Sequence, residues 1–231
     1  MSRILIPSRR ARNWRRFLAD PKKQWKWGYS ARATAHCWES SDGLPDEIAT
    51  LLGPETELLL AIPEHKVALP GGRRESQCDV FALVRRAGGT CAVAVEAKVN
   101  EPFGDTVGTW LKDASAGKME RLSFICERLG VACPPDPTLR YQLFHRTVAA
   151  IVEAERFGAE SAAMVVQSFA QDYRWFDDFA AFGACFGASL VPGQAAEVRL
   201  PSGMPLILGW ATGAPAFLSR SGVASFRRGR G

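Results

Sequence analysis

The sequence predicts a single mixed α/β domain whose first strands form an antiparallel meander. Two apolar runs between Gln77 and Val99 are separated by Arg-Ala-Gly-Gly, and glycines at that position favour a β-hairpin turn. The stretch 139–158 carries apolar side chains at the spacing of one long amphipathic helix. Hydrophobic residues make up 47% of the chain, which is enough for a sizeable core around these elements.

The remaining elements follow from periodicity and from turn residues. Pro45 and Gly53 suit the start and the end of one helix, and Asp105 or Thr106 can cap another. The order is helix, three strands, helix, helix, strand, helix and hairpin, as in an α/β domain. We expect helices over 13–19, 30–38, 42–53, 107–130 with a break at 116–117, and 177–187, and strands over 56–69, over 161–170 and in a hairpin over 196–213.

The composition excludes several classes of protein. No run of 18 or more apolar residues occurs, so no membrane-spanning helix is expected. The basic N-terminus lacks the apolar segment of a secretory signal. The six cysteines form no CxxC pair, and none of the three histidines has ligand spacing with a cysteine pair. We therefore expect reduced thiols, a cytoplasmic location and no zinc site.

Positive charge is concentrated at the two ends of the chain. Residues 1–32 contain ten Lys or Arg residues and one acid, a net charge of +9. Residues 33–231 contain nineteen Lys or Arg residues and 23 acids, a net charge of −4. We predict a basic N-terminal arm over 1–32, one domain over 33–219 and a basic C-terminal tail over 220–231. Basic segments on a mildly acidic body favour a polyanionic partner, although basic termini are also often only solvated.

Two acids and a lysine within the predicted hairpin define the candidate site. With the turn centred between Ala87 and Gly88, Asp79 lies opposite Glu96, and Lys98 shares their face because side chains alternate along a strand. Facing carboxylates repel each other, and burying them unpaired is costly. The arrangement favours Mg²⁺ or Mn²⁺ bound between Asp79 and Glu96. Lys98 would then act on a water molecule or on a phosphate group.

The order and strand context of Asp79 and of Glu-Ala-Lys at 96–98 resemble the PD-(D/E)XK nuclease superfamily. Cys78 stands where that pattern has its name-giving proline. A wider set of segments looks like a bacterial family of unknown function placed in that superfamily: WKWGYSA, LPGG, SQCDVFAL, VEAKVNEPFG, RYQLFHRT and SFAQDYRWFDDF. The resemblance implies a restriction-endonuclease-like core of helix, antiparallel β-meander, helix and strand, with extra helices and a C-terminal hairpin. It implies little about the substrate.

The resemblance also implies a further glutamate from the helix before the meander. Glu39 and Glu47 are the two possibilities. We prefer Glu39, because the helix dipole alone explains an acid at Glu47 in a first turn. Glu64, just after Pro63, either faces the same site or ends its strand in solvent.

The long helix and the turn before the hairpin offer supporting side chains. Gln142 and Arg146 lie four residues apart on one helix face, and the superfamily often directs a polar residue from such a helix toward its metal centre. Gln77 is expected to approach Lys98 or the substrate. His145 lies one position from this face, where a lone histidine is more often a structural hydrogen-bonding group than a catalyst.

Aromatic and basic residues alternate in the segment KKQWKWGYSAR at 22–32. This pattern suits bases stacked on aromatic rings beside lysines that neutralise phosphates. The competing interpretation is that the aromatic residues anchor the arm to the body. The predicted nucleic-acid-binding residues are Lys22, Lys23, Trp25, Lys26, Trp27 and Tyr29.

Together these features predict a Mg²⁺- or Mn²⁺-dependent nuclease with Asp79, Glu96, Lys98 and Glu39 as catalytic residues. DNA is favoured over RNA as the nucleic acid, and the oligomeric state stays open, a dimer included. One alternative is a catalytically silent nuclease-like module that binds nucleic acid or a protein, and another is a pocket for a different phosphorylated ligand. Because facing carboxylates repel, Asp79→Asn and Glu96→Gln are expected to stabilise the metal-free protein.

Overall fold

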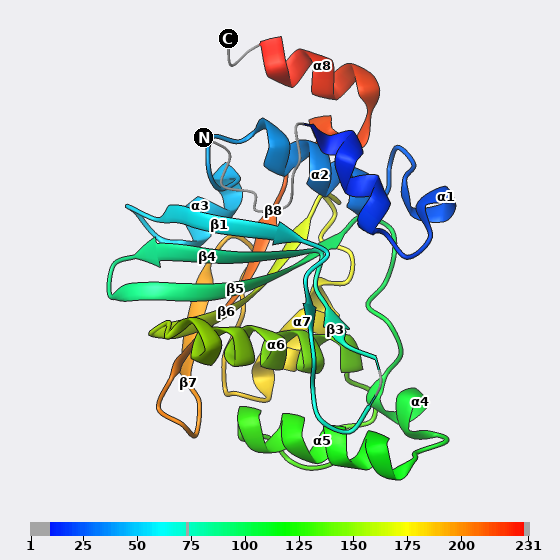
Figure 1. Cartoon of the computed structure of the whole chain (residues 1–231), viewed down its shortest axis with the longest axis vertical. Coiled ribbons are helices and arrows are strands. Elements are labelled where there is room, and N and C mark those ends of the chain that lie inside the picture. Colours follow the sequence, from blue (N-terminus) through cyan, green and yellow to red (C-terminus); the bar gives the residue numbers. More distant parts are fainter. Residues whose placement is uncertain (1–9, 73, 229–231) are drawn as a thin grey trace.

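The computed structural model describes residues 10–72 and 74–228, and its centre is a six-stranded mixed sheet with helices on both faces (Figure 1). Residues 1–9 of the predicted arm and 229–231 of the predicted tail lie outside the described residues. The strands of this sheet, in spatial order, are β1 (Glu57–Pro63), β4 (Val80–Arg86), β5 (Gly89–Lys98), β6 (Ser161–Ser168), β8 (Pro205–Thr212) and β7 (Ala195–Arg199). A second, two-stranded sheet pairs β2 (Lys66–Val67) with β3 (Ser76–Gln77).

Helices flank the sheet on both sides, so the predicted mixed α/β class is confirmed. They are the 3₁₀ helix η1 (Ala11–Phe17), α1 (Pro21–Gln24), α2 (Ser30–Ser40), α3 (Asp46–Leu52), α4 (Val107–Leu111), α5 (Ala116–Leu129), α6 (Tyr141–Phe157), α7 (Phe176–Ala184), the 3₁₀ helix η2 (Pro215–Leu218) and α8 (Arg220–Arg228). Within the described part of the chain, every helix is too short or too polar to span a bilayer.

The predicted meander is present, and its register is the one expected from the sequence. β1, β4 and β5 pair antiparallel, and Arg86 pairs with Gly89 across the turn. Gly88 and Gly89 have φ of 90° and 114°, which glycine adopts far more readily than other residues. β6 and β8 then extend the sheet in parallel with β5, and β7 closes the far edge antiparallel to β8.

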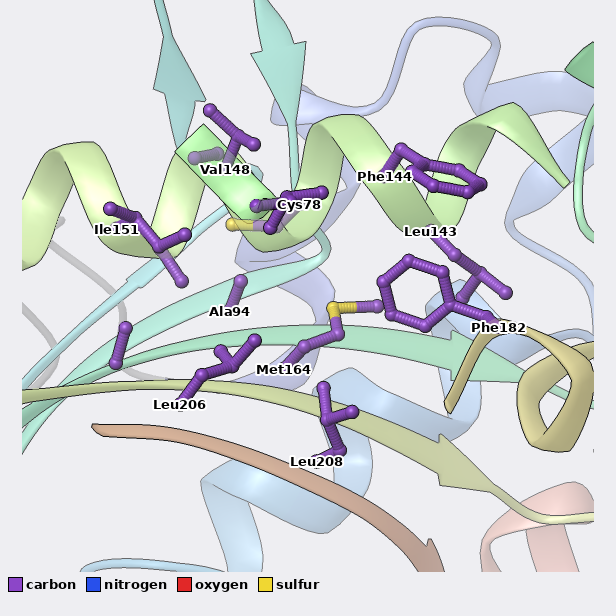
Figure 2. Packing of buried hydrophobic residues seen from close by; sticks show 14 of the residues in the cluster. Cys78, Ala94, Leu143, Phe144, Val148, Ile151, Met164, Phe182, Leu206 and Leu208 are labelled. Atoms are coloured by element: carbon purple, nitrogen blue, oxygen red, sulfur yellow. The ribbon is translucent and has the colours of Figure 1, made fainter. Parts of the chain in front are cut away.

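One face of the sheet packs against α6. Phe144, Val148 and Ile151 on this helix are fully buried, as the apolar stripe predicted. Figure 2 shows Ile151 directed toward the sheet, where Met164 and Leu208 lie, and all three helix residues belong to one cluster with these two. α5 lies on the outer side of α6 (Figure 1). This packing fixes the face of α6 that looks toward the ends of β4 and β5.

The opposite face of the sheet packs against α2 and α3. Trp38 and Ile48 from these helices are buried in the same cluster as Val93 and Val95 of β5. Since β5 contributes alternate residues to the two clusters, its even-numbered positions face α6 and its odd-numbered positions face α2. Glu96 and Lys98 are therefore on the α6 side.

The break in the predicted helix over 107–130 lies earlier than expected. α4 ends at Leu111 and α5 begins at Ala116, because Ser115 caps the new helix: its Oγ accepts a hydrogen bond from Lys118 N at 3.3 Å. Both α5 and α6 end at a glycine in the left-handed conformation, Gly130 and Gly158, as the sequence indicates.

The predicted basic arm over 1–32 is not a separate segment where the structure describes it. Ala11 and Trp14 of η1 are 1% and 3% exposed and belong to the core under α2. Gly28 N donates to Leu218 O at 3.0 Å. Apolar residues between the arginines thus bind this segment to the domain, and charge counting alone could not show that.

The predicted tail over 220–231 also packs on the domain where it is described. It forms α8, whose Val223 is buried and whose Phe226 ring lies 4.6 Å from the ring of Phe217, centre to centre. α8 therefore covers η2 on the α2 side of the molecule (Figure 1).

Candidate active site

An open cleft of about 430 Å³ lies where β1 ends, β4 begins and β5 ends. Seven of its polar lining residues, which we call the carboxylate pocket, are Glu64, Gln77, Asp79, Glu96, Lys98, Gln142 and Arg146. On the N-terminal side the cleft is lined by Ala19, Lys23, Gln24, Tyr29, Ser30 and Ala31. The structure thus brings together three of the four predicted catalytic residues and all three predicted supporting residues.

The hairpin register places Asp79 beside Glu96. Val80 pairs with Val95 at the end of the β4–β5 ladder, so Asp79 and Glu96 are the next opposed positions. Asp79 is held there because its Oδ2 accepts a hydrogen bond from Ala97 N at 2.7 Å. The predicted common face of Asp79, Glu96 and Lys98 is confirmed, since all three line one cleft.

Glu96 is the buried anchor of the pocket. Its Oε1 accepts from Lys98 Nζ at 2.7 Å and from Gln142 Nε2 at 2.6 Å, and its Oε2 accepts from Arg146 Nε at 2.9 Å. Burial alone would raise the pKa of Glu96, but the charges of Lys98 and Arg146 outweigh it and lower the pKa. Glu96 is therefore ionised and has both oxygens engaged.

Within the described part of the chain, Asp79 and Glu64 have no cationic hydrogen-bond partner of the kind that Glu96 has in Lys98 and Arg146. Burial, and then the charges of Glu96 and Glu64, raise the pKa of Asp79 well above its ordinary value. Burial raises the pKa of Glu64 to about 7, against the opposing effect of the hydrogen bond from Gln77 Nε2 at 2.6 Å. Both carboxyl groups would release their protons more readily beside a cation.

Glu64 reaches this position through an unusual backbone conformation. Its φ is 54°, in the left-handed region that non-glycine residues rarely occupy. Glu64 N donates to Asp79 O at 2.8 Å, and Lys66 pairs with Gln77 in the small sheet that follows. Such strain is found most often at functional sites.

The donor set suits a hard divalent cation held largely by water. Asp79 Oδ1 and Glu64 Oε1 accept no hydrogen bond from the described residues, although the other oxygen of each group does. Mg²⁺ needs only one or two carboxylates and keeps several water molecules. Among the described residues no three His, Cys, Asp or Glu side chains form a complete metal cluster. Asp79 and Glu64 are thus the residues with an oxygen available to hold a cation, whereas the sequence predicted Asp79 and Glu96.

His145 supports the pocket from behind. Its Nδ1 lies 2.9 Å from Ser76 Oγ, which also accepts from Arg146 Nη1 at 3.3 Å. Burial, and then the charges of Arg146 and Arg121, lower the pKa of His145 well below its ordinary value, so the ring is neutral. His145 is the structural hydrogen-bonding group that the sequence favoured, and it helps to orient Arg146.

The preference for Glu39 as a site residue is wrong for this structure. Glu39 Oε1 accepts from Trp14 Nε1 at 2.6 Å, and Glu39 does not line the cleft. α2 reaches the cleft with Ser30 and Ala31 at its start, and Glu39 lies roughly 13 Å further along the helix axis. Glu64 supplies the third carboxylate instead.

The predicted nucleic-acid-binding segment divides into two groups. Trp25 and Trp27 stack on His36, with ring centres 6.5 and 5.1 Å apart, and Arg32 lies 3.6 Å from the Trp27 ring centre. These two tryptophans therefore anchor the chain, which was the competing interpretation. The other four residues are exposed at or near the cleft: Lys22, Lys23, Lys26 and Tyr29.

Glu101 lines the cleft and was missed from the sequence. Its Oε1 accepts from Ser30 N at 3.0 Å and its Oε2 from Asn100 N at 2.9 Å, which ties the end of β5 to the start of α2. The signal available in the sequence was an acidic residue three positions after Lys98, close to the predicted site.

Comparison with known proteins shows the family but no activity. A family model described as "Domain of unknown function (DUF6946)" matches residues 7–215. The chain belongs to this family. No curated protein and no solved structure matches the chain significantly. The range matched by DUF6946 contains the whole carboxylate pocket and ends before α8.

Proposed function

We propose that this DUF6946 chain is a Mg²⁺- or Mn²⁺-dependent nuclease that cleaves phosphodiester bonds in DNA. The observation that carries the proposal is the carboxylate pocket: Asp79, Glu64 and Glu96 converge with Lys98 and Arg146 in one open cleft. Three acids face two cationic side chains, and two of the acids have raised pKa values. A divalent cation and a phosphate group would complete this set of charges.

We further propose that the fold is a restriction-endonuclease-like core. α2, the β1-β4-β5 meander, α6 and β6 follow one another in the required order, with α3, α4 and α5 as further helices between them. Asp79 and Glu96 stand at adjacent strand ends within that core, which supports the assignment.

The residues of the pocket have separate roles in this proposal. Asp79 and Glu64 would hold the metal ion, which when bound supplies Lewis acidity and lowers the pKa of a bound water. Lys98, held by Glu96 at 2.7 Å, provides the positive charge that orients a water molecule or a phosphate oxygen. Arg146 keeps Glu96 ionised from the other side, at 2.9 Å.

Gln142 acts as the link between these groups. Its Nε2 donates to Glu96 Oε1, and its Oε1 accepts from Lys98 Nζ at 3.4 Å and from Gly104 N at 3.2 Å. It thereby fixes the orientation of both charged residues from α6. We place it as a positioning residue.

One observation favours the catalytically silent module as a second candidate. Both oxygens of Glu96 are engaged by protein donors, so Glu96 as it stands stabilises the pocket without facing a ligand. In such a binding module, Glu96 would have a structural role, and the cleft would hold nucleic acid or a protein without cleaving it. We propose a cytoplasmic protein in either case.

A cleavage assay separates the two candidates. Plasmid DNA, single-stranded DNA and RNA are incubated with wild type in Mg²⁺, Mn²⁺ or EDTA. We expect metal-dependent cleavage of DNA that falls by about 10²- to 10⁴-fold in Lys98→Ala and Asp79→Asn. Lys112→Ala and Asp113→Asn, which change exposed residues of the same types, are the matched controls and should cleave like wild type. Absence of cleavage in every metal would leave the silent module.

A further inference from the structure

A second hollow shares the short helix α1 with the cleft of the carboxylate pocket, since α1 contributes lining residues to both. It has a volume of about 370 Å³, and we call its lining residues the arginine hollow: Arg12, Asn13, Arg15, Arg16 and Pro21. Pro21 begins α1, and Lys23 and Gln24 of the same four-residue helix line the cleft of the carboxylate pocket. α1 is therefore the wall that the two hollows share. In Figure 1 the dark-blue η1 lies against α2, and α1 lies further out.

The arginine hollow is rich in positive charge that is held in place. Among the residues that the structure describes, no carboxylate lines it, and Arg12 and Arg15 are exposed and make no ion pair or hydrogen bond. Ala11 and Trp14, buried between these arginines, fix η1 to the domain. Guanidinium groups on a fixed segment without counter-charge are well suited to bind phosphate.

The wall between the two hollows is also basic. Lys22 and Lys23 of α1 are exposed. Asp20 caps α1, since its Oδ1 accepts from Lys22 N and from Lys23 N at 3.1 Å each, and its Oδ2 lies 3.5 Å from Lys23 Nζ. An anionic chain that crosses α1 would meet the ammonium groups of Lys22 and Lys23, the second of them beside Asp20.

We propose that the arginine hollow binds a phosphate group of the same nucleic-acid strand whose scissile phosphate enters the carboxylate pocket, so that the strand crosses α1. This inference rests on the proposed function. A helix with its side chains is about 10 Å across, and neighbouring phosphates of one strand advance about 3.4 Å along a duplex. The two sites are therefore roughly three or more nucleotides apart, and the substrate class is a polynucleotide strand.

The inference is tested by binding, with cleavage suppressed. Fluorescence anisotropy in EDTA measures the affinity for labelled DNA and RNA strands of about three and about fifteen nucleotides at several salt concentrations. Wild type is compared with Arg12→Gln/Arg15→Gln and with the control Arg85→Gln/Arg199→Gln. The control removes the same charge from exposed arginines outside both hollows.

We expect Arg12→Gln/Arg15→Gln to bind the long strand at least about tenfold more weakly, with a salt slope smaller by about 1.4 for two lost contacts. The short strand should bind all three proteins alike. Equal affinity and slope in wild type and Arg12→Gln/Arg15→Gln, an equal loss in the control, or no binding of either strand by wild type would each overturn the inference.

Cleavage is measured separately with Mn²⁺ on the same proteins. Long-strand binding that depends on Arg12 and Arg15 without any cleavage would support the arginine hollow and reject the nuclease. If wild type cleaves and Arg12→Gln/Arg15→Gln binds the long strand as wild type does, phosphate binding in the arginine hollow is rejected and the proposed nuclease activity is retained.

Discussion

Two polar clusters lie on opposite faces of the same end of the sheet, and they differ in charge balance. On the α6 face is the carboxylate pocket. On the α2 face is a set that we call the glutamine cluster: Cys37, Trp38, Glu47 and Gln167. Gln167 on β6 pairs in the ladder with Ala97, the residue between Glu96 and Lys98. Neighbouring positions of one sheet thus direct polar side chains into two different environments.

In the glutamine cluster, Gln167 links Trp38 to Glu47 by hydrogen bonds. Gln167 is fully buried, and its Oε1 accepts from Trp38 Nε1 at 3.1 Å while its Nε2 donates to Glu47 Oε1 at 2.6 Å. Burial, and then the charge of Glu47, raise the pKa of Cys37 well above its ordinary value, so its thiol stays protonated. One carboxylate with several donors is a stable structural arrangement.

The carboxylate pocket differs because it holds three carboxylates beside the cations Lys98 and Arg146, whereas the glutamine cluster holds the single carboxylate of Glu47. A polar residue inside a sheet therefore indicates function when its charge is left unbalanced, and structure when its hydrogen bonds are complete. Substitutions on the two faces should separate these roles.

The largest effect on stability is expected at Glu96. Glu96→Gln leaves Lys98 and Arg146 without their shared anion in a buried setting, and we expect the free energy of unfolding to fall by about 3–5 kcal/mol. This reverses the expectation from sequence that removing the charge of Glu96 would stabilise the metal-free protein. Glu57→Gln, at an exposed pair with Arg85, should cost less than about 1 kcal/mol. Urea unfolding of both variants checks the difference.

A smaller effect on stability is expected at Gln167. Gln167→Leu leaves Trp38 Nε1 without an acceptor and Glu47 without its closest donor, at a cost of about 1–3 kcal/mol. The same variant should keep the wild-type response to metal and the wild-type cleavage rate per folded molecule. A lost metal response in Gln167→Leu would show that the two clusters are not independent.

The pH dependence of stability should distinguish Glu64, whose pKa is raised, from Glu96, whose pKa is lowered. The pKa of Glu64 is about 7 in the folded protein and about 4.5 when unfolded, so the folded state binds the proton more tightly in that range. Stability of the metal-free protein should fall as pH rises from 4.5 to 7, by less than about 3 kcal/mol because the group reaches water.

Glu64→Gln is the variant that tests this slope. It retains an oxygen to accept from Gln77, and it should remove the part of the loss between pH 4.5 and 7 that Glu64 contributes, leaving the contribution of Asp79, whose pKa is also raised. Glu96 affects the pH dependence of stability in the opposite direction. Because its pKa is lowered in the folded protein, it contributes stability that is lost as pH falls through the folded pKa. An unchanged slope in Glu64→Gln, measured by thermal melts across this range, would count against the assignment.

Much of this architecture follows from local sequence patterns, and the parts that do not are informative. The register that opposes Asp79 and Glu96 was predictable, because strand alternation and the turn at Gly88 leave one solution. The place of Glu39 was not, since it depends on how Trp14 packs on α2. Glu64 was considered but not preferred, because its positive φ has no sequence signal.

The positive charge of the N-terminal segment is read directly from the sequence, whereas the packing of η1 on the domain is not. Ten basic residues in 1–32 suggested a free arm. Buried Ala11 and Trp14 between the arginines instead fix the segment beside the pocket. Contacts between segments distant in sequence decide such cases.

The stabilisation of the fold by a bound metal ion tests the central claim most directly, because only the carboxylate pocket should respond to the metal. Melting temperature is measured with and without millimolar Mg²⁺ or Mn²⁺, with and without oligonucleotide, for wild type, Asp79→Asn, Lys98→Ala and Gln167→Leu. We predict that metal at about ten times its dissociation constant raises the free energy of unfolding of wild type by about 1.4 kcal/mol, which is seen as a higher melting temperature. Lys98→Ala and Gln167→Leu should gain the same amount, and Asp79→Asn should gain nothing. No gain in wild type under any of these conditions would contradict the account and leave the carboxylate pocket as part of a catalytically silent module.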